Sequence, residues 1–188
     1  MNPHEILKLA GGLLALVMYV PLIKDVLRFG SAGQSFATWG LWAGLDSMLT
    51  ITLWVQHGNY SLSLGYAVGG LILTAVLLKR GGFSWGIFET IITLLVLACI
   101  VIWKFSGPRN ASIAITAAVC FATIPGLMEM LSNPQPASRK IWAGFTVASG
   151  LSYFGGTTMT VEERLTPAVF TILCALMFVA SCRLPRTK

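Results

Sequence analysis

The chain has 188 residues, of which 55% are hydrophobic and only 11% are charged. A soluble globular domain carries about 25% charged residues, so this composition excludes an ordinary soluble domain and indicates a surface that faces lipid. The formal net charge of +6 does not require a nucleic-acid partner, because basic residues near the ends of membrane spans act as topology signals.

Seven stretches have the length and apolarity of membrane-spanning helices. Such a helix needs about 20 mostly apolar residues, within a range of roughly 17–25. The predicted spans cover residues 6–23, 36–56, 61–79, 84–104, 110–131, 138–156 and 165–182. They are continuous apolar runs rather than the alternating segments of about ten residues that build a membrane β-barrel. The sequence therefore predicts an all-α membrane protein.

A short phrase occurs twice along the chain. The first copy runs from Pro21 in the first span, through a basic loop, to Trp42-Ala-Gly in the second span. The second copy runs from Pro125 in the fifth span, through another basic loop, to Trp142-Ala-Gly in the sixth span. A membrane protein built from two similar halves most often carries a solute, because the halves can rock around a central site.

The spacing of the two copies predicts their relative direction. Four spans, an even number, separate the two prolines, so both copies cross the membrane in the same direction. Two three-helix units joined directly would be inverted, so a single linking helix is needed between them. We therefore expect two parallel three-helix bundles, residues 1–81 and 108–188, joined by a linker helix within residues 82–107.

The segment that begins at Tyr19 resembles a PQ-loop motif. In that family a helix ends at Pro-Gln or Pro-Leu, here Pro21-Leu22, and a short basic loop leads to Ser-x-x-Thr-Trp, here Ser35-Phe-Ala-Thr38-Trp39. The three-one-three layout with an outside N-terminus is similar to the SWEET sugar transporters and their PQ-loop relatives. The second copy departs from the motif with Pro125-Gly126, and the asparagine pair of the SWEET proteins has no clear counterpart. The resemblance thus implies a transporter more strongly than it implies a sugar as the cargo.

The basic residues predict the orientation in the membrane. One side collects nine of them, namely Lys24, Arg28, Lys79, Arg80, Arg139, Lys140, Arg183, Arg186 and Lys188, and the other side collects Lys8, Lys104, Arg109 and Arg164. The side richer in Lys and Arg is expected to be cytoplasmic. We therefore expect the N-terminus outside and the C-terminus in the cytoplasm, in a plasma or inner membrane.

Asp46 is the most informative single residue, because it lies near the middle of the second predicted span. A charge at the bilayer centre costs about 3 kcal/mol on insertion scales, so this carboxyl is expected to face the bundle interior. Trp39, Trp42 and Asp46 are three and four residues apart and share one helix face. Two indoles and a carboxyl suit a small organic solute with a flat or cationic part. The alternatives are tryptophans at the lipid interface and a carboxyl that only joins helices.

Rings and hydroxyls at mid-depth extend this candidate site into other spans. The predicted substrate-binding residues are Trp39, Trp42, Asp46, Thr50, Tyr66, Trp142, Thr146 and Tyr153. Hydroxyls at helix interfaces also serve packing, which is their alternative role. Asp46 and Glu89 are the candidates for proton coupling, with pairing to Lys79 or Arg80 as the alternative for Glu89.

Two prolines and two acidic residues recur at matching places and predict moving parts. Pro21 and Pro125 each lie inside a span, where proline removes a backbone hydrogen bond and kinks the helix, so we expect hinges there. Asp25 and Glu129 follow the prolines by one turn, and each has basic neighbours. They predict an inner gate made of salt bridges, with solvated charges worth under about 1 kcal/mol as the alternative.

The sequence carries no sign of catalysis or of a bound cofactor. It contains no GxSxG, HExxH or P-loop pattern, so hydrolytic and nucleotide-driven chemistry lack support. The four cysteines fall in or at the ends of apolar spans without a CxxC pair, which predicts packing residues rather than a disulfide or a metal site. We therefore expect no enzyme, no cofactor and no metal.

These features together predict a transporter for a small polar metabolite, such as a sugar, an amino acid or a vitamin-like solute. It would work by alternating access, facilitative or proton-coupled, with the solute and the lipid bilayer as its partners and no nucleic acid. The rival hypothesis is a non-transporting PQ-loop-type receptor or scaffold, which would tolerate Asp46→Asn. Assembly into a homo-oligomer is left open.

Overall fold

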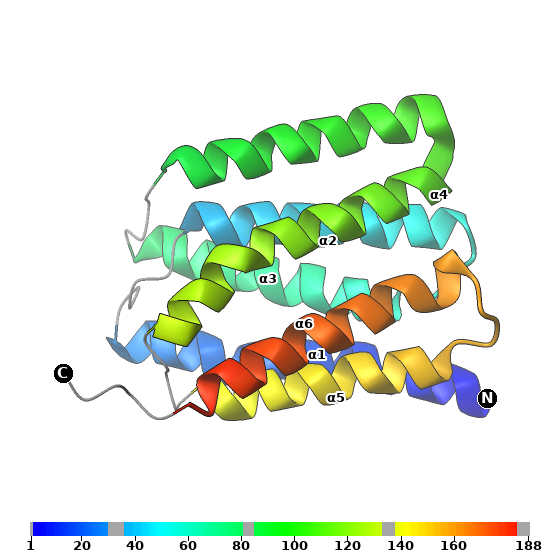
Figure 1. The fold of residues 1–188 in the computed structure, drawn as a ribbon. Coiled ribbons are helices and arrows are strands. Elements are labelled where there is room, and N and C mark those ends of the chain that lie inside the picture. The colour runs from blue at the N-terminus through cyan, green and yellow to red at the C-terminus, as the bar shows by residue number, and fades with distance from the viewer. Residues whose placement is uncertain (1, 30–35, 81–84, 133–137, 184–188) are drawn as a thin grey trace.

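The computed structural model describes residues 2–29, 36–80, 85–132 and 138–183, and these ranges contain helices and no strand. In chain order the elements are α1 (Pro3–Phe29), α2 (Phe36–Val55), α3 (Ser61–Lys79), α4 (Ile87–Ser132), α5 (Arg139–Gly155), a short π-helical segment η2 (Val161–Leu165) and α6 (Thr166–Ser181). The helices lie side by side along one long direction (Figure 1). The all-α prediction is confirmed.

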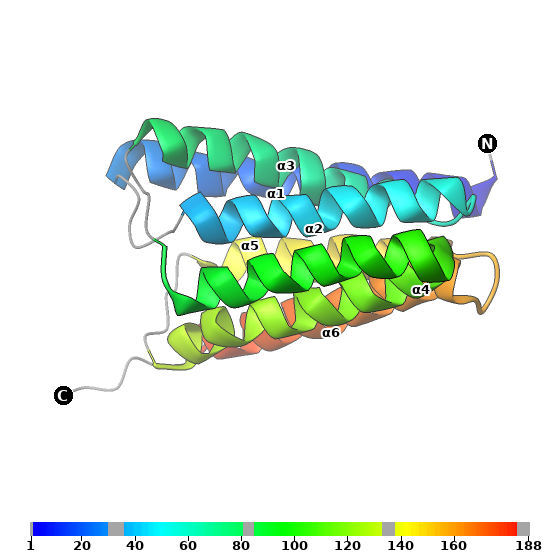
Figure 2. The same cartoon turned by 90° about the horizontal axis from the view of Figure 1, so that it is seen from above.

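The bundle has two ends, which Figures 1 and 2 show from two sides. Its amino end holds the start of α1, the turn between α2 and α3, the bend of α4, and η2. Its carboxyl end holds the end of α1, the start of α2 and the end of α6.

Long apolar helices and an apolar outer surface are consistent with a membrane protein. Four helical segments, Pro3–Arg28, Ser61–Lys79, Ile87–Ser132 and Val161–Ser181, are long and apolar enough to cross a membrane. Large apolar side chains point outward along the bundle, and Leu13, Leu94 and Val179 are each more than 60% exposed. Water would not tolerate so much exposed apolar surface, whereas lipid does.

Seven separate spanning helices are more than the structure shows. From residue 87 on, the predicted spans 84–104 and 110–131 fall within one element, α4, which is interrupted at Gly107. The predicted spans 36–56 and 138–156 correspond to α2 and α5, which are not among the four segments that are both long and apolar enough. The reason is that α5 has only 17 residues, while α2 carries Asp46 and several hydroxyl side chains. The structure thus supports an all-helical membrane protein and leaves the seven-helix layout as a proposal.

The long element α4 consists of two helical arms that fold back on each other at Gly107 (Figure 1). Gly107 adopts φ 80° and ψ 173°, a conformation that costs little only for glycine. Pro108 follows it, and a proline fits the first turn of a helix because no backbone donor is needed there. The first arm, residues 87–106, lies at the edge of the bundle, and only Ile92 and Cys99 are buried along it.

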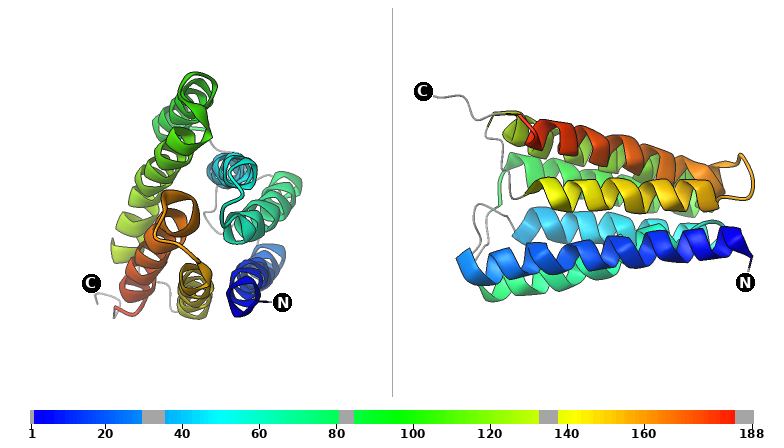
Figure 3. Two further views of the ribbon diagram at one scale, coloured as in Figure 1. Left: turned by 90° about the vertical axis from the view of Figure 1, so that its right-hand side faces the viewer. Right: turned by 90° about the horizontal axis from the view of Figure 1, so that it is seen from below.

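The helices pack in two groups that then meet. Helix α3 packs against both α1 and α2, and α6 packs against both α4 and α5. Across the groups, α1 packs against α5 and α2 packs against α4. The end-on view in Figure 3 shows this arrangement, with α3 and α6 each seated beside two neighbours.

Two glycines allow α1 and α5 to approach closely toward the amino end. A Cβ atom on Gly11 would lie 2.7 Å from the Ala148 carbonyl oxygen, and one on Gly155 would lie 2.8 Å from the Lys8 backbone nitrogen. Real Cβ atoms do not sit this close to backbone atoms, so glycine is required at both positions. The contact between α1 and α5 is called the α1–α5 seam below.

Candidate functional site

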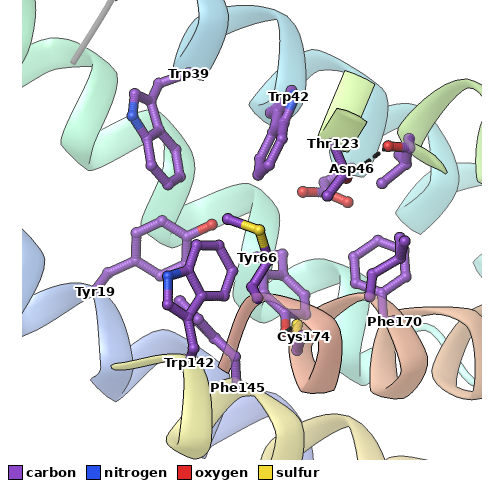
Figure 4. Close-up of a pocket in the computed structure, with 13 residues that line it drawn as sticks. Tyr19, Trp39, Trp42, Asp46, Tyr66, Thr123, Trp142, Phe145, Phe170 and Cys174 are labelled. Atoms are coloured by element: carbon purple, nitrogen blue, oxygen red, sulfur yellow. Dashed lines mark hydrogen bonds between the residues drawn. The ribbon is translucent and has the colours of Figure 1, made fainter. Parts of the chain in front are cut away.

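A buried pocket lies inside the bundle, where side chains from all six α-helices meet. Its lining residues are Tyr19, Trp39, Trp42, Asp46, Tyr66, Val119, Thr123, Trp142, Phe145, Phe170, Leu173, Cys174 and Met177. Figure 4 shows these side chains around one shared space. The pocket therefore belongs to residues that lie far apart along the chain.

Aromatic rings form most of the pocket wall, since seven of the lining residues are Trp, Tyr or Phe. Tyr19 meets Trp39 edge-on with the ring centroids 6.0 Å apart, and Trp39 meets Trp42 at 5.5 Å. Tyr66 packs on Phe145 at 5.1 Å. Edge-to-face and tilted contacts at these distances are favourable, so the rings hold one another in place.

Asp46 is the one residue with a formal charge among the described residues that line the pocket. It is 5% exposed, and its Oδ1 atom has no hydrogen-bond partner in the described part of the chain. Figure 4 shows the carboxylate turned toward the space beside Trp42 and Phe170. A buried polar atom without a partner is rare and costly, so this oxygen marks a place where something outside the chain is expected to bind.

Five of the eight predicted binding residues line this pocket, namely Trp39, Trp42, Asp46, Tyr66 and Trp142. The other three lie elsewhere. The hydroxyls of Thr50 and Thr146 donate to carbonyl oxygens one turn earlier in their own helices, at 2.7 and 2.8 Å. The ring of Tyr153 lies 4.9 Å from the Arg164 guanidinium at the amino end. The prediction for these three residues used their position along the predicted spans. Position along a span does not determine which way a side chain points.

Several lining residues were not predicted, and the repeat could have revealed two of them. Tyr19 lies two residues before Pro21, and Thr123 lies two residues before Pro125, so the two copies contribute matching positions to the pocket. Phe145 follows Trp142 by three residues and shares its helix face. The residues on α6 carry no comparable signal, because an apolar helix of this kind offers no distinctive pattern.

The pocket is narrow in this conformation. The space open to the centre of a water molecule is about 30 Å³, whereas pockets that hold small molecules usually measure about 300–1,000 Å³. This space accommodates water but no organic solute. A solute would therefore require the rings or the helices to move apart.

A buried ion pair closes the amino end of the bundle. The Nζ atom of Lys8 lies 3.0 Å from Oε2 of Glu163, and both side chains are only 10% exposed. The backbone N–H of Thr157 donates to the same carboxylate at 3.1 Å. Nearby, the side-chain amide of Asn59 donates to the carbonyl oxygen of Ser152 at 2.9 Å. These contacts join the first helix, the α2–α3 turn, α5 and η2.

A second and more open hollow, with a volume of about 370 Å³, lies at the amino end. Its lining residues are Gln56, His57, Gly58, Thr158, Thr160, Glu162 and Glu163. Glu162 pairs with Arg109 at 3.2 Å, and the Arg109 side chain is 65% exposed. This polar, open hollow was not predicted, because it forms where two segments from distant parts of the chain, residues 56–58 and 158–163, come together.

The predicted hinges and gate residues lie away from the pocket lining. Pro21 and Pro125 stand inside α1 and α4, and helix continues on both sides of each. Asp25 is half-buried near the end of α1, and Glu129 is exposed near the end of α4. All four belong to the ends of these helices at the carboxyl end of the bundle, and their roles as hinges and gate stay predictions.

Glu89 fastens the start of α4 in the manner of a capping residue. Its Oε2 atom accepts the Gly86 backbone N–H at 2.8 Å, and its Oε1 atom accepts the Thr38 hydroxyl at 3.0 Å. Arg80, one of its two predicted ion-pair partners, donates instead to the carbonyl oxygen of Leu27 at 3.0 Å. The predicted part of Glu89 in proton coupling stays a prediction.

Within the described ranges, no three His, Cys, Asp or Glu side chains gather closely enough to hold a metal ion. No protein-family model, no curated protein and no solved structure matches this chain.

Proposed function

We propose that this chain is a membrane carrier that moves a small metabolite through the central pocket by alternating access. The observation that carries the proposal is a buried pocket walled by all six α-helices, with a carboxylate oxygen inside it that no protein group satisfies. Carriers place their solute near mid-membrane between two halves of the chain, and a pocket lined by α1, α2 and α3 together with α4, α5 and α6 is consistent with that placement. A sugar, an amino acid or a vitamin-like solute is the class expected from the sequence.

In this proposal the chain crosses the membrane seven times, because each arm of α4 crosses separately. The first arm, residues 87–106, has a helical length of about 30 Å, which matches the thickness of the hydrocarbon core. The second arm, residues 108–132, is longer. The first arm then serves as the linker between two bundles of three helices, with boundaries near residues 81 and 108.

The packing of the helices supports two related halves. In this comparison α1, α2 and α3 correspond in order to the second arm of α4, to α5 and to α6. The contact of α1 with α5 then corresponds to the contact of the second arm of α4 with α2, which includes the hydrogen bond that the Ser112 hydroxyl donates to the Thr52 hydroxyl at 3.0 Å. In the same way, the two neighbours of α3 correspond to the two neighbours of α6. Parallel repeats around an axis along the membrane normal give this pattern, and it favours the resemblance to the PQ-loop and SWEET proteins.

The two ends of the bundle supply the basis for alternating access. The amino end is closed by the Lys8–Glu163 pair and by the α1–α5 seam. Solute can reach the pocket from that end only when both contacts separate. Pro21 and Pro125, with Asp25 and Glu129 beyond them, are the proposed hinges and gate toward the other end.

The charge distribution favours an amino end that faces outward. Lys24, Arg28 and Lys79 lie near the carboxyl end of the bundle, where α1 and α3 finish. Cytoplasmic loops carry the excess of Lys and Arg. The carboxyl end is therefore the proposed cytoplasmic side, and Asp46 is the proposed site of any proton coupling.

Uptake into proteoliposomes tests the proposal. Purified protein is reconstituted and exposed to a broad panel of sugars, amino acids, amines and vitamins, beside the Asp46→Asn variant. Glu5→Gln is the matched control, because it makes the same chemical change on a side chain that is 54% exposed at the amino end. Glu5 lies 3.5 Å from Lys8, and Glu163 remains as the closer partner of Lys8 at 3.0 Å in this control. The carrier proposal fails if the unmodified protein moves no solute of the panel into the liposomes.

A non-transporting receptor or scaffold is the second candidate, and the narrowness of the pocket favours it. A cavity with room for water alone would suit a bundle that moves nothing. Such a protein would keep its binding partner and its fold after Asp46→Asn, whereas a carrier would lose uptake. The same variant therefore separates the two candidates.

A further inference from the structure

We infer that the central pocket selects an organic monocation with an apolar or aromatic body, of the substituted ammonium class. The inference rests on the proposed carrier function, because it names the substrate class of the same pocket. It stands on three features of the wall: one uncompensated acidic group, a majority of aromatic rings, and few polar groups without a partner.

The first step concerns charge. Asp46 is 5% exposed, and its Oδ1 atom is unpartnered. The lining residues include no Lys, Arg or His that could neutralise it. Burying a carboxylate without a positive partner is strongly unfavourable, and a cationic ligand supplies the missing partner. An anion would add a second negative charge to the same space.

The second step concerns the rings. Trp39, Trp42 and Trp142 line the pocket together with two Tyr and two Phe side chains. Cations are attracted to aromatic faces, most strongly to Trp, and quaternary ammonium groups are commonly bound by cages of aromatic rings. Asp46 and Trp42 come from one helix face, so the carboxylate and the ring stand together. A wall of this kind binds a positive head group without hydrogen-bonding it.

The third step excludes the other classes. The Tyr66 hydroxyl is engaged with Ser149 at 3.2 Å and with the Cys174 sulfur at 3.5 Å. The Thr123 hydroxyl donates to the carbonyl oxygen of Val119 at 2.8 Å. Of the buried polar atoms on the described wall, Trp42 Nε1 and Asp46 Oδ1 are without a hydrogen-bond partner. A sugar would bury many hydroxyls here with only these few partners, and an unpaired buried hydroxyl is costly. A zwitterionic amino acid would bury its carboxylate beside Asp46 with no basic residue on the wall.

The narrow cavity defines which probes are suitable. Because it holds only about 30 Å³ of space for water, the rings must move outward to admit a solute, and compact cations are the appropriate probes. Choline and benzyltrimethylammonium carry the ammonium group. The alcohol 3,3-dimethylbutan-1-ol has the shape of choline with carbon in place of nitrogen and carries no charge.

Binding to the purified full chain, measured by titration calorimetry or tryptophan fluorescence, compares these three probes. We expect the dissociation constants of the two cations to be lower than that of the neutral alcohol by a factor of about ten or more, because a desolvated cation–aromatic contact contributes enough free energy for that ratio. Equal affinity for choline and the alcohol would overturn the inference. This comparison uses the unmodified protein, so it does not depend on the folding of any variant.

The variant Asp46→Asn extends the test. We expect it to lose about tenfold or more of its affinity for choline and to keep its affinity for the neutral alcohol. Glu5→Gln, the control, should bind both as the unmodified protein does. Undiminished choline affinity in a folded Asp46→Asn protein would overturn the inference.

The uptake panel separates this inference from the carrier proposal. If neutral sugars or amino acids are moved while neither cation binds or competes, the carrier proposal stands and the cationic substrate class is wrong. If the cations bind through Asp46 but no solute is moved into the liposomes, the carrier proposal is wrong and the cation site stands.

Discussion

Two buried carboxylates, Glu163 at the amino end and Asp46 in the central pocket, show how differently one bundle treats the same group. Glu163 is 8% exposed and Asp46 is 5% exposed. Glu163 is compensated by the Lys8 ammonium and a backbone N–H, whereas Asp46 has an oxygen with no partner. A buried charge with a partner of opposite charge holds structural elements together. A buried carboxylate without such a partner is stabilised when it binds a cationic ligand or a proton. The amino end is thus interpreted as a closure and the pocket as a binding site.

The largest expected effect comes from breaking the compensated pair. Lys8→Ala leaves Glu163 buried without its cation, so the free energy of unfolding should fall by about 3–5 kcal/mol. Thermal unfolding in detergent measures the loss. The double variant Lys8→Ala with Glu163→Gln should recover part of it, because no unpaired charge is left. A melting temperature of Lys8→Ala equal to that of the unmodified protein would contradict a structural role for the pair.

The close approach of α1 and α5 is tested next. Gly11→Ala places a Cβ atom 2.7 Å from the Ala148 carbonyl oxygen, and overpacking of this kind costs about 1–3 kcal/mol. Gly150→Ala in α5 is the matched control, because no atom lies within 4 Å of its Cβ position; helix propensity should then raise stability by up to about 1 kcal/mol. Equal melting temperatures for the two variants would mean that the seam is loose.

Removing the charge of the uncompensated carboxylate should not lower the free energy of unfolding, in contrast to Lys8→Ala, which removes the partner of Glu163. Asp46→Asn removes a buried charge that has no cationic partner on the pocket wall, so stability should stay level or rise by up to about 2 kcal/mol. The measurement is again thermal unfolding in the absence of any solute. A fall of more than about 1 kcal/mol would show that the protein itself uses this carboxylate, as it uses Glu163.

The smallest expected effect belongs to the repeat counterpart of Asp46. The Thr146 hydroxyl donates to the Trp142 carbonyl oxygen in its own helix and is absent from the pocket lining. Thr146→Ala should therefore change stability by less than about 0.5 kcal/mol and leave choline binding unchanged. A tenfold loss of choline affinity in Thr146→Ala would show that Thr146 belongs to the binding site, as the sequence predicts.

Residue spacing in the sequence was sufficient to predict part of the central pocket. The spacing of Trp39, Trp42 and Asp46 places them on one face of α2, and that face does line the pocket. An ionisable side chain near the centre of an apolar helix is much less costly in the bundle interior than in lipid. Asp46 could therefore be predicted as an interior residue from its position alone. Trp42 and Trp142, the matched tryptophans of the repeated phrase, were both predicted at the site, and both line the pocket.

The amino end could not be predicted by the same means. Lys8 counts in the sequence as one of the charges that orient the chain, yet the structure buries it against Glu163, which lies 155 residues further along. Only the fold brings α1 and η2 together. The bend at Gly107 lies between the predicted spans 84–104 and 110–131. Its form could not be predicted, because a glycine and a proline inside an apolar stretch predict a loop as readily as a sharp turn between helical arms.

Uptake by proteoliposomes that hold equal amounts of the unmodified protein and of Asp46→Asn is the most direct test of the central claim. The panel spans ammonium compounds, sugars, amino acids and vitamins. We predict that the unmodified protein accumulates at least one solute above empty liposomes and that Asp46→Asn loses about tenfold or more of that uptake while remaining folded. Equal uptake by the two proteins, or none by either, would contradict the assignment of the central pocket as the solute site.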